Sequence, residues 1–166
     1  MSQERFNDFK ELFIHELKDI YSAESMLIDA LPEVANACTN ERLQKAIEEH
    51  HRETVEQKRR LDEVAQMLNV DLTGETCDAM KGLITENESM IKSEAEGNIK
   101  DAGIIAGAQR VEHYEIAAYG TVCAFARDLG FDDIASLLEQ TLDEEKEADS
   151  KLNDIAINHV NARAMH

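Results

Sequence analysis

Apolar residues recur every three or four positions along most of the chain, which is the spacing of one face of an α-helix. Four long segments show this period, at about residues 3–38, 40–68, 99–129 and 132–160, and a shorter segment shows it at residues 77–92. No segment has the alternating pattern that is typical of a strand. The pattern therefore predicts an all-α protein.

The residues between the periodic segments predict how the helices connect. Thr39 or Asn40 could cap the second helix, Gly130 is typical of a helix C-terminus, and Pro32 could kink the first helix. Short connections near residues 39 and 130 favour two antiparallel hairpins, and the long connection carrying residues 77–92 favours a crossover with a short extra helix. We expect residues 1–166 to form a single domain of this four-helix-bundle topology.

Polar residues interrupt the apolar stripe of every long helix. Glu24 stands among leucines and isoleucines of the first helix, and each of the other three carries at least two such residues. Those on the later helices are His50, Glu53 and Gln57, then Glu112 and Glu115 with Tyr119 one turn further, and finally Glu145 and Asp149. The stripes thus point acidic side chains toward the centre of the predicted bundle.

The inward acids also share one depth. Glu24 and Glu53 lie about 15 residues either side of the turn near residue 39, and Glu115 and Glu145 lie 15 residues either side of Gly130. Residues equidistant from the turn of an antiparallel hairpin lie side by side, here about 20 Å from each turn. If the crossover aligns the hairpins, the acids converge in one layer.

A layer of buried carboxylates needs positive charge, because each unpaired buried charge costs several kcal/mol. The stripes carry no Lys or Arg at this level, and shared protons would neutralise only some of the acids. Two divalent cations would neutralise the layer, and glutamates with one imidazole suit iron or manganese better than structural zinc. Di-iron carboxylate bundles match this set in outline.

A simpler interpretation stays open for each residue. The chain is acidic enough to place some glutamates on apolar stripes by chance, and a lone His50 could be a hydrogen-bonded core residue. Asp149 could be a ligand, a partner of a ligand, or solvated. Gln57 is expected to hydrogen-bond to a ligand or to fill space, and Tyr119 to pack in the core with its hydroxyl bonded.

Composition excludes several other functions. The net charge of −18 argues against direct binding of nucleic acid, which requires a basic face. The start MSQERFND lacks the apolar region of a signal peptide, and no apolar run reaches the length of a membrane span. The three cysteines have no paired spacing, so we expect reduced thiols in a cytoplasmic protein.

Four sequence blocks carry a resemblance to a known family. YSAESML (21–27), HHRET (50–54), VEHYEIAAYG (111–120) and LDEEKEAD (142–149) together resemble the YciF/YciE-type bacterial ferritin-like proteins, closest to the YciF branch, over nearly the whole chain. The resemblance implies a ferritin-like four-helix bundle with an extra crossover helix, a homodimer and a role in bacterial stress responses. Its implied metal residues are Glu24, His50, Glu53, Glu112, Glu115 and Glu145.

The chain departs from the general di-iron pattern in its ligand types. His50 precedes Glu53, the reverse of Glu-x-x-His, and Glu115 stands where a second histidine is usual. The resulting carboxylate-rich set strengthens the case for manganese or magnesium. We therefore expect a dinuclear metal protein, with iron or manganese and with oxygen or peroxide as a small oxidant. The alternative is a structural or partner-binding helical stress protein whose metal site is not catalytic.

Overall fold

The computed structural model describes residues 5–166, in which all regular structure is helical, as the sequence predicts. The predicted start of the first helix at residue 3 lies outside the described residues. The elements are α1 (Phe9–Ala37), α2 (Glu41–Leu68), α3 (Asp78–Ile91), α4 (Gly97–Asp128), α5 (Asp132–Ile155), the π-helical turn η1 (Ala156–Val160) and α6 (Asn161–Ala164). None of these helices combines the length and the apolar character needed to cross a membrane.

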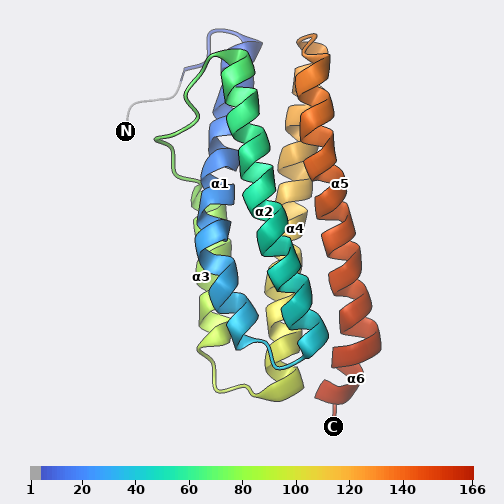
Figure 1. Cartoon of the computed structure of the whole chain (residues 1–166). Coiled ribbons are helices and arrows are strands. Elements are labelled where there is room, and N and C mark those ends of the chain that lie inside the picture. Colours follow the sequence, from blue (N-terminus) through green and yellow to red (C-terminus); the bar gives the residue numbers. More distant parts are fainter. Residues whose placement is uncertain (1–4) are drawn as a thin grey trace.

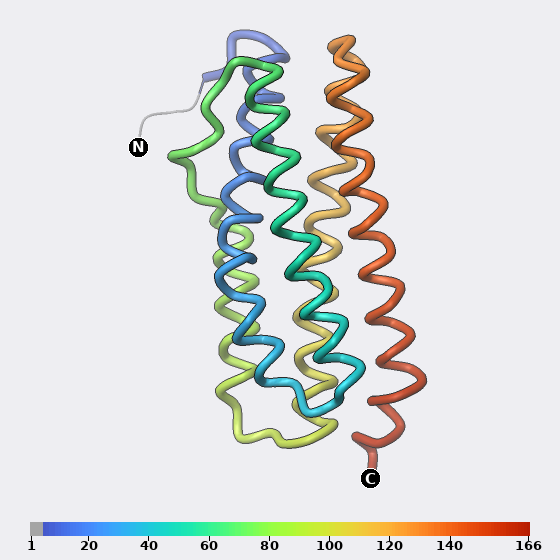
Figure 2. Tube along the Cα trace, in the orientation of Figure 1, coloured from blue at the N-terminus to red at the C-terminus, as the bar shows by residue number. Residues whose placement is uncertain are grey.

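The helices form two antiparallel hairpins that lie side by side (Figure 1). The first hairpin is α1 with α2 and the second is α4 with α5, and α2 also packs against α5. Residues 69–96 connect the hairpins along the length of the bundle, so that α2 and α4 run in the same direction (Figure 2). Helix α3 lies within this connection and packs against α1 and α4.

The first helix begins later than its hydrophobic pattern predicts. The carboxylate of Asp8 accepts a hydrogen bond from the backbone N–H of Glu11 at 2.8 Å, and this N-cap sets the start at Phe9. Phe6, which continues the apolar pattern of this segment toward the N-terminus, therefore precedes the helix and is 42 % exposed.

Pro32 does not interrupt α1, and the reason lies on the neighbouring helix. Proline has no N–H, so the carbonyl of Ile28 loses its usual helical donor. Nε2 of His51, on α2, lies 3.1 Å from this oxygen, and a carbonyl can only accept, so the ring nitrogen donates. The first hairpin thus supplies the bond that the proline removes.

Two turns fix the hairpins. Asn40 caps α2 by accepting hydrogen bonds from the N–H groups of Arg42 and Leu43 at 3.0 and 3.2 Å. Gly130 ends the α4 segment with a φ of +75°, a conformation that favours glycine, and the next residue, Phe131, donates its N–H to the carbonyl of Ala126 at 2.8 Å. The predicted cap and the predicted C-terminal glycine are both present.

The turn of the first hairpin is also bound to α4. Asp101, near the start of α4, is fully buried and accepts three hydrogen bonds from this turn. The donors are the N–H of Thr39 at 2.8 Å, the hydroxyl of Thr39 at 2.6 Å and the N–H of Asn40 at 2.9 Å. Asp101 therefore sets the axial position of the first hairpin on the second.

The apolar interior consists of two separate clusters. One lies toward the turn at residue 39 and includes Leu31, Leu43 and Ile104, while the other lies toward Gly130 and includes Phe13, Leu61 and Leu138. Both clusters bury their side chains almost completely. The layer that separates them is polar, and it contains the acids that the sequence places at one depth.

Candidate metal centre

The polar layer draws one or two side chains from each of the four long helices. Glu24 comes from α1, His50 from α2, Glu112 and Glu115 from α4, and Glu145 from α5. None of these five residues is more than 4 % exposed. Each occupies an inward position of a regular helix, so its burial follows from the helical period alone.

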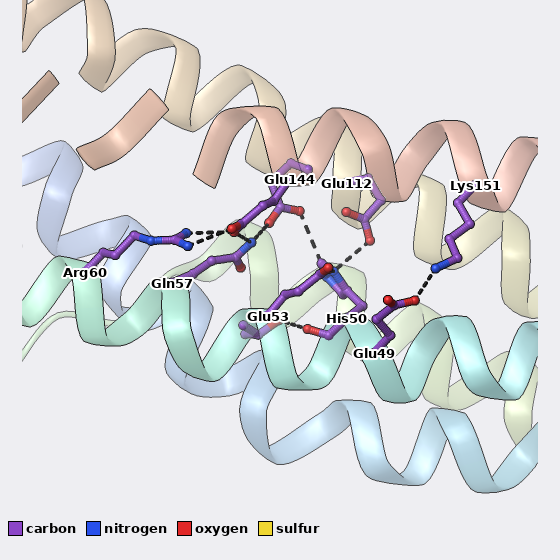
Figure 3. A network of polar contacts seen from close by, with 10 residues as sticks. Glu49, His50, Glu53, Gln57, Arg60, Glu112, Glu144 and Lys151 are labelled. Carbon is purple, nitrogen blue, oxygen red and sulfur yellow. Dashed lines mark hydrogen bonds and ion pairs between the residues drawn. The ribbon is translucent and has the colours of Figure 1, made fainter. Parts of the chain in front are cut away.

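Four of these residues meet closely. One ligand atom from each of His50, Glu112, Glu115 and Glu145 lies within 4.8 Å of the ligand atoms of the other three. Nε2 of His50 is 3.4 Å from Oε1 of Glu112 and 4.0 Å from Oε2 of Glu145. Figure 3 shows the imidazole of His50 pointing across the bundle toward Glu112. Three helices therefore bring one nitrogen and three carboxylates to a common point.

These groups have few hydrogen-bond partners. Nine buried side-chain N or O atoms in residues 5–166 have none, and seven of the nine belong to this layer. They are Oε2 of Glu24, both ring nitrogens of His50, Oε2 of Glu112, both carboxylate oxygens of Glu115, and Oε2 of Glu145. Since buried polar groups in proteins are nearly always bonded, such a concentration points to a ligand.

Electrostatics in the layer favours protonation wherever no cation is bound. Burial, followed by the negative charge of Glu145, raises the pKa values of Glu24, Glu112 and Glu115 well above the usual range of a glutamate. Burial disfavours the charged form of His50, but the nearby carboxylates of Glu53 and Glu145 outweigh it and raise the pKa of the imidazole. Burial and mutual repulsion thus both favour the protonated, neutral form of Glu24, Glu112 and Glu115.

Glu24 lies in the same layer but has a partner of its own. The hydroxyl of Tyr119, which is fully buried, donates a hydrogen bond to Oε1 of Glu24. Burial and the charge of Glu24 raise the pKa of Tyr119 above that of an ordinary tyrosine. Tyr119 thus combines core packing with a bonded hydroxyl, and it leaves Oε2 of Glu24 without a partner.

A chain of hydrogen bonds from α2 holds the carboxylate of Glu145. The amide of Gln57 donates to Oε1 of Glu145 at 2.5 Å and to Oε2 of Glu144 at 3.1 Å. Arg60 then binds both oxygens of Glu144 at 2.7 Å and the hydroxyl of Thr141 at 3.1 Å. Figure 3 shows Gln57 and Arg60 of α2 reaching Glu144 of α5. Arg60 is therefore paired with Glu144 and is linked to Glu145 through Gln57.

Glu53 and Asp149 lie at the edge of the layer. The side chain of Glu53 is 38 % exposed, and its Oε2 is 3.7 Å from Nδ1 of His50 (Figure 3). Asp149 is 24 % exposed and contacts Gln109 and His113 on α4, at 3.2 and 3.3 Å. The structure thus places Glu53 next to the group of four and gives Asp149 partners outside it.

A cavity of about 40 Å³ opens between α2 and α5 and reaches His50 and Glu112. Acidic side chains line it, namely Glu49, Glu53, Glu144 and Glu147. The ammonium group of Lys151 on α5 pairs with Glu49 on α2 beside this opening (Figure 3). The opening therefore connects the buried group of four to solvent through an acidic passage.

The donor set fits a hard or borderline divalent cation. Carboxylate oxygens dominate, one imidazole is present, and no cysteine belongs to the group. Oxygen ligands with imidazole suit manganese, iron or magnesium, whereas a closed structural zinc site would use thiolates or more histidines. Within residues 5–166 no Lys or Arg forms an ion pair with these carboxylates, so the group has no countercharge from a basic side chain.

Sequence reasoning placed Gln57 and Tyr119 beside the buried acids but missed the ion pair that lies behind Gln57. Glu144 and Arg60 were not among the predicted site residues, although Arg60 binds both oxygens of Glu144 at 2.7 Å. One signal was present, because Arg60 lies three residues after Gln57 and shares its face of α2. The side chain of arginine is long enough to reach inward from the edge of a helix face.

Comparison with known proteins gives a consistent result. Residues 8–165 match the family model described as a domain of unknown function, DUF892. The protein YciF of Escherichia coli (strain K12) is 46 % identical over 156 residues, which cover 93 % of this chain and 94 % of that protein. The resemblance that the four sequence blocks predict is thereby confirmed.

Solved structures agree with the fold. The crystal structure of the E. coli stress protein YciF has a TM-score of 0.91 at 45 % identity, covering 94 % of this chain and 99 % of that chain. YcfI of Rhodopseudomonas palustris, described as a candidate structural protein, has a TM-score of 0.89 at 41 % identity, covering 95 % and 99 %. A protein of Xanthomonas campestris, with a TM-score of 0.76 at 20 % identity, shares the fold.

Proposed function

Since the chain belongs to the DUF892 family and buries an unpartnered group of one histidine and three glutamates that could hold a metal ion, we propose that it is a ferritin-like protein with a dinuclear centre of iron or manganese. In this proposal the centre serves oxygen- or peroxide-linked redox activity during bacterial stress. The observation that carries the proposal is the group of seven unpartnered polar atoms in one buried layer. A pair of such ions would supply electron transfer and charge neutralisation at this point.

The chain's own residues divide the remaining work. His50, Glu112, Glu115 and Glu145 are the proposed central ligands, with Glu24 and Glu53 completing the set at opposite edges. Gln57 holds Oε1 of Glu145 and so directs Oε2 of that carboxylate into the layer. Tyr119 holds Oε1 of Glu24 in the same manner. These bonds fix the carboxylates before any cation arrives, which lowers the cost of binding.

The acidic passage between α2 and α5 is the proposed route of cation entry. Its glutamates attract divalent cations from solvent, and the passage ends at His50 and Glu112. Lys151 and Glu49 are each 48 % exposed, so the ion pair that joins them beside the opening is weak and can open readily.

Anaerobic titration with Fe(II), followed by mixing with oxygen, tests the proposal. We expect about two Fe(II) per chain to bind and an optical change from Fe(III) to follow oxygen. Glu145→Ala should lose both signals, whereas Asp143→Ala, which alters an exposed carboxylate on the same helix, should keep both. Binding that is equally negligible in all three proteins would overturn the proposal.

A second candidate function is a structural or partner-binding role in which the metal site is not catalytic. The description of YcfI as a candidate structural protein favours it. Under this alternative the chain either binds metal without any optical change on adding oxygen, or has lost the ability to bind metal. Metal binding with a silent spectrum would therefore select the alternative.

The proposal also includes a homodimer in the cytoplasm that binds neither membranes nor nucleic acid directly. The net charge of −18 supports the absence of nucleic-acid binding, and the likeness to ferritin-like proteins is the ground for expecting a dimer. Light scattering of the purified chain tests this point, since a monomeric mass would contradict it.

A further inference from the structure

A second cavity touches the polar layer from the opposite side. It lies between α1, α3 and α4, has a volume of about 40 Å³ and is closed off from solvent in part by α3. Its walls are mainly apolar and include Leu27, Leu31, Val34, Ile84, Ile91 and Val111. Glu112 and Ile47 belong to the walls of both this cavity and the acidic passage. The apolar cavity therefore ends at a proposed metal ligand.

The helix that covers this cavity is held close to α4 by two glycines. A Cβ atom at Gly107 would lie 2.2 Å from Oδ1 of Asn87, and one at Gly103 would lie 2.4 Å from the sulfur of Met90. The carbonyl oxygen of Asn87 is consequently packed against the backbone of α4, and it has no hydrogen-bond donor. The short distance fixes α3 as the outer wall of the cavity.

The polar groups of the cavity are poorly placed to hold water. Glu33 is exposed and Glu88 is partly exposed and paired with Lys92, so both belong to the outer rim. Asn87 and Glu112 also line the cavity, but Oδ1 of Asn87 and Oε2 of Glu112 are covered by protein atoms and are not accessible to a water molecule. A buried water needs two to four polar partners, and apolar cavities without them stay dry and take up apolar molecules. The volume corresponds to roughly three water-sized spheres, which suits a molecule of two or a few atoms.

We propose that this cavity admits dioxygen, a small apolar molecule, and brings it to the Glu112 side of the polar layer. The inference rests on the proposed function for its purpose, because a cavity for an oxidant is useful beside a redox centre. It gives the two reactants separate routes: charged cations enter through the acidic passage between α2 and α5, and the apolar oxidant enters beneath α3.

Xenon binding tests the inference without any metal, since xenon occupies dry apolar cavities of this kind. Crystals of the full chain under xenon pressure should show one xenon atom between α1, α3 and α4. Ala108→Leu, which fills the cavity from α4, should abolish it, and Ala106→Leu, the same change at an exposed position of the same helix, should leave it unchanged. Ala30→Leu, at a partly exposed wall position, repeats the test should Ala108→Leu fail to fold.

Mn(II) binding measured on the same variants separates this inference from the proposed function. Ala108→Leu should bind Mn(II) as the wild type does, because it changes no ligand. With Fe(II) loaded, its oxidation by dissolved oxygen should be at least about 10-fold slower than in Ala106→Leu. Ordered waters in the wild-type cavity, or no xenon there, would overturn the inference, whatever the metal content. Loss of Mn(II) binding in the wild type would instead overturn the proposed function.

Discussion

Asp101 and Glu115 are carboxylates on the same helix, and both are at most 1 % exposed, yet their surroundings differ completely. Asp101 accepts three hydrogen bonds from Thr39 and Asn40, so the backbone of a turn compensates its burial. Neither oxygen of Glu115 has a partner, and burial together with the charges of Glu145, Glu24 and Glu112 raises the pKa of Glu115. Burial alone therefore does not distinguish a functional carboxylate from a structural one; the bonds that it makes do.

Removal of the carboxylate charge is expected to have opposite effects on stability at Asp101 and at Glu115. Removing the charge of Asp101 leaves donors of the turn without an acceptor, which costs free energy. Removing the charge of Glu115 relieves a buried repulsion in the metal-free protein. Variants of the two residues, measured for stability and for metal binding, test whether this distinction holds.

The largest expected effect is on metal affinity when Glu115, the carboxylate without hydrogen-bond partners, is removed. Glu115→Ala should lower the affinity for Mn(II) at least about 100-fold, since loss of a direct ligand should exceed the 10- to 100-fold cost of losing a ligand's partner. Calorimetric titration measures this affinity, and Asp101→Asn is the matched control on the same helix. A Glu115→Ala protein that binds Mn(II) like the wild type would remove Glu115 from the ligand set.

The free energy of unfolding should change most when the hydrogen-bonded carboxylate of Asp101 is altered. Asp101→Asn replaces an acceptor by an amide in front of N–H and O–H donors, and we expect a loss of about 2–3 kcal/mol in the free energy of unfolding. Urea denaturation measures it, with Asp29→Asn, at an exposed position of α1, as the control. A loss below about 0.5 kcal/mol, the level of an ordinary surface change, would show that the turn does not depend on Asp101.

A smaller effect on affinity is expected from the residue that positions Glu145. Gln57→Met keeps the volume of the side chain but removes the amide that donates to Glu145 and Glu144. We expect about a 10-fold weaker affinity for Mn(II), with two ions still bound at saturation. Gln44→Met, a half-buried change on the same helix, should have no effect. Equal affinities in the two variants would exclude a positioning role for Gln57.

The smallest expected effect is a gain in stability from Glu115→Gln, opposite in sign to the loss expected from Asp101→Asn. In metal-stripped protein near neutral pH, Glu115→Gln should raise the free energy of unfolding by about 1 kcal/mol, because a neutral amide removes the desolvation cost and the repulsion from Glu145. Urea denaturation again provides the measurement. Destabilisation comparable to that of Asp101→Asn would mean that Glu115 makes stabilising contacts, and the distinction between the two regions would fail.

The helical period predicted the inward acids well. Glu24, His50, Glu112, Glu115 and Glu145 all lie where a regular helix directs them, and their equal distance from the two turns places them in one layer. Such positions follow from backbone geometry, which the sequence determines over a few turns of a helix. No knowledge of side-chain conformation was needed.

Positions at the edge of a helix face were harder to predict. Asp149 is on the stripe by periodicity but contacts Gln109 and His113, and Glu144 is off the stripe but is bound by Gln57 and Arg60. Long side chains at an edge can turn toward either neighbour, and contacts between helices decide which. The bonds of Asp101 were equally hidden, because its partners are about 60 residues away in the sequence.

The most direct test of the account compares thermal unfolding of metal-stripped and Mn(II)-loaded protein across pH. The raised pKa values of Glu24, Glu112 and Glu115 mean that the folded metal-free protein holds extra protons. Their stabilising contribution is complete below the unfolded pKa of about 4.3 and is lost as the pH rises through the folded values. Metal binding requires the deprotonated carboxylates, so its stabilisation grows with pH.

We therefore predict that the metal-stripped protein becomes less stable from about pH 5 to about pH 8. Saturating Mn(II) should raise its melting temperature by about 10 °C at the upper end and by much less at the lower end. Identical melting temperatures with and without metal at about pH 8 would contradict the claim that cations neutralise the buried acids.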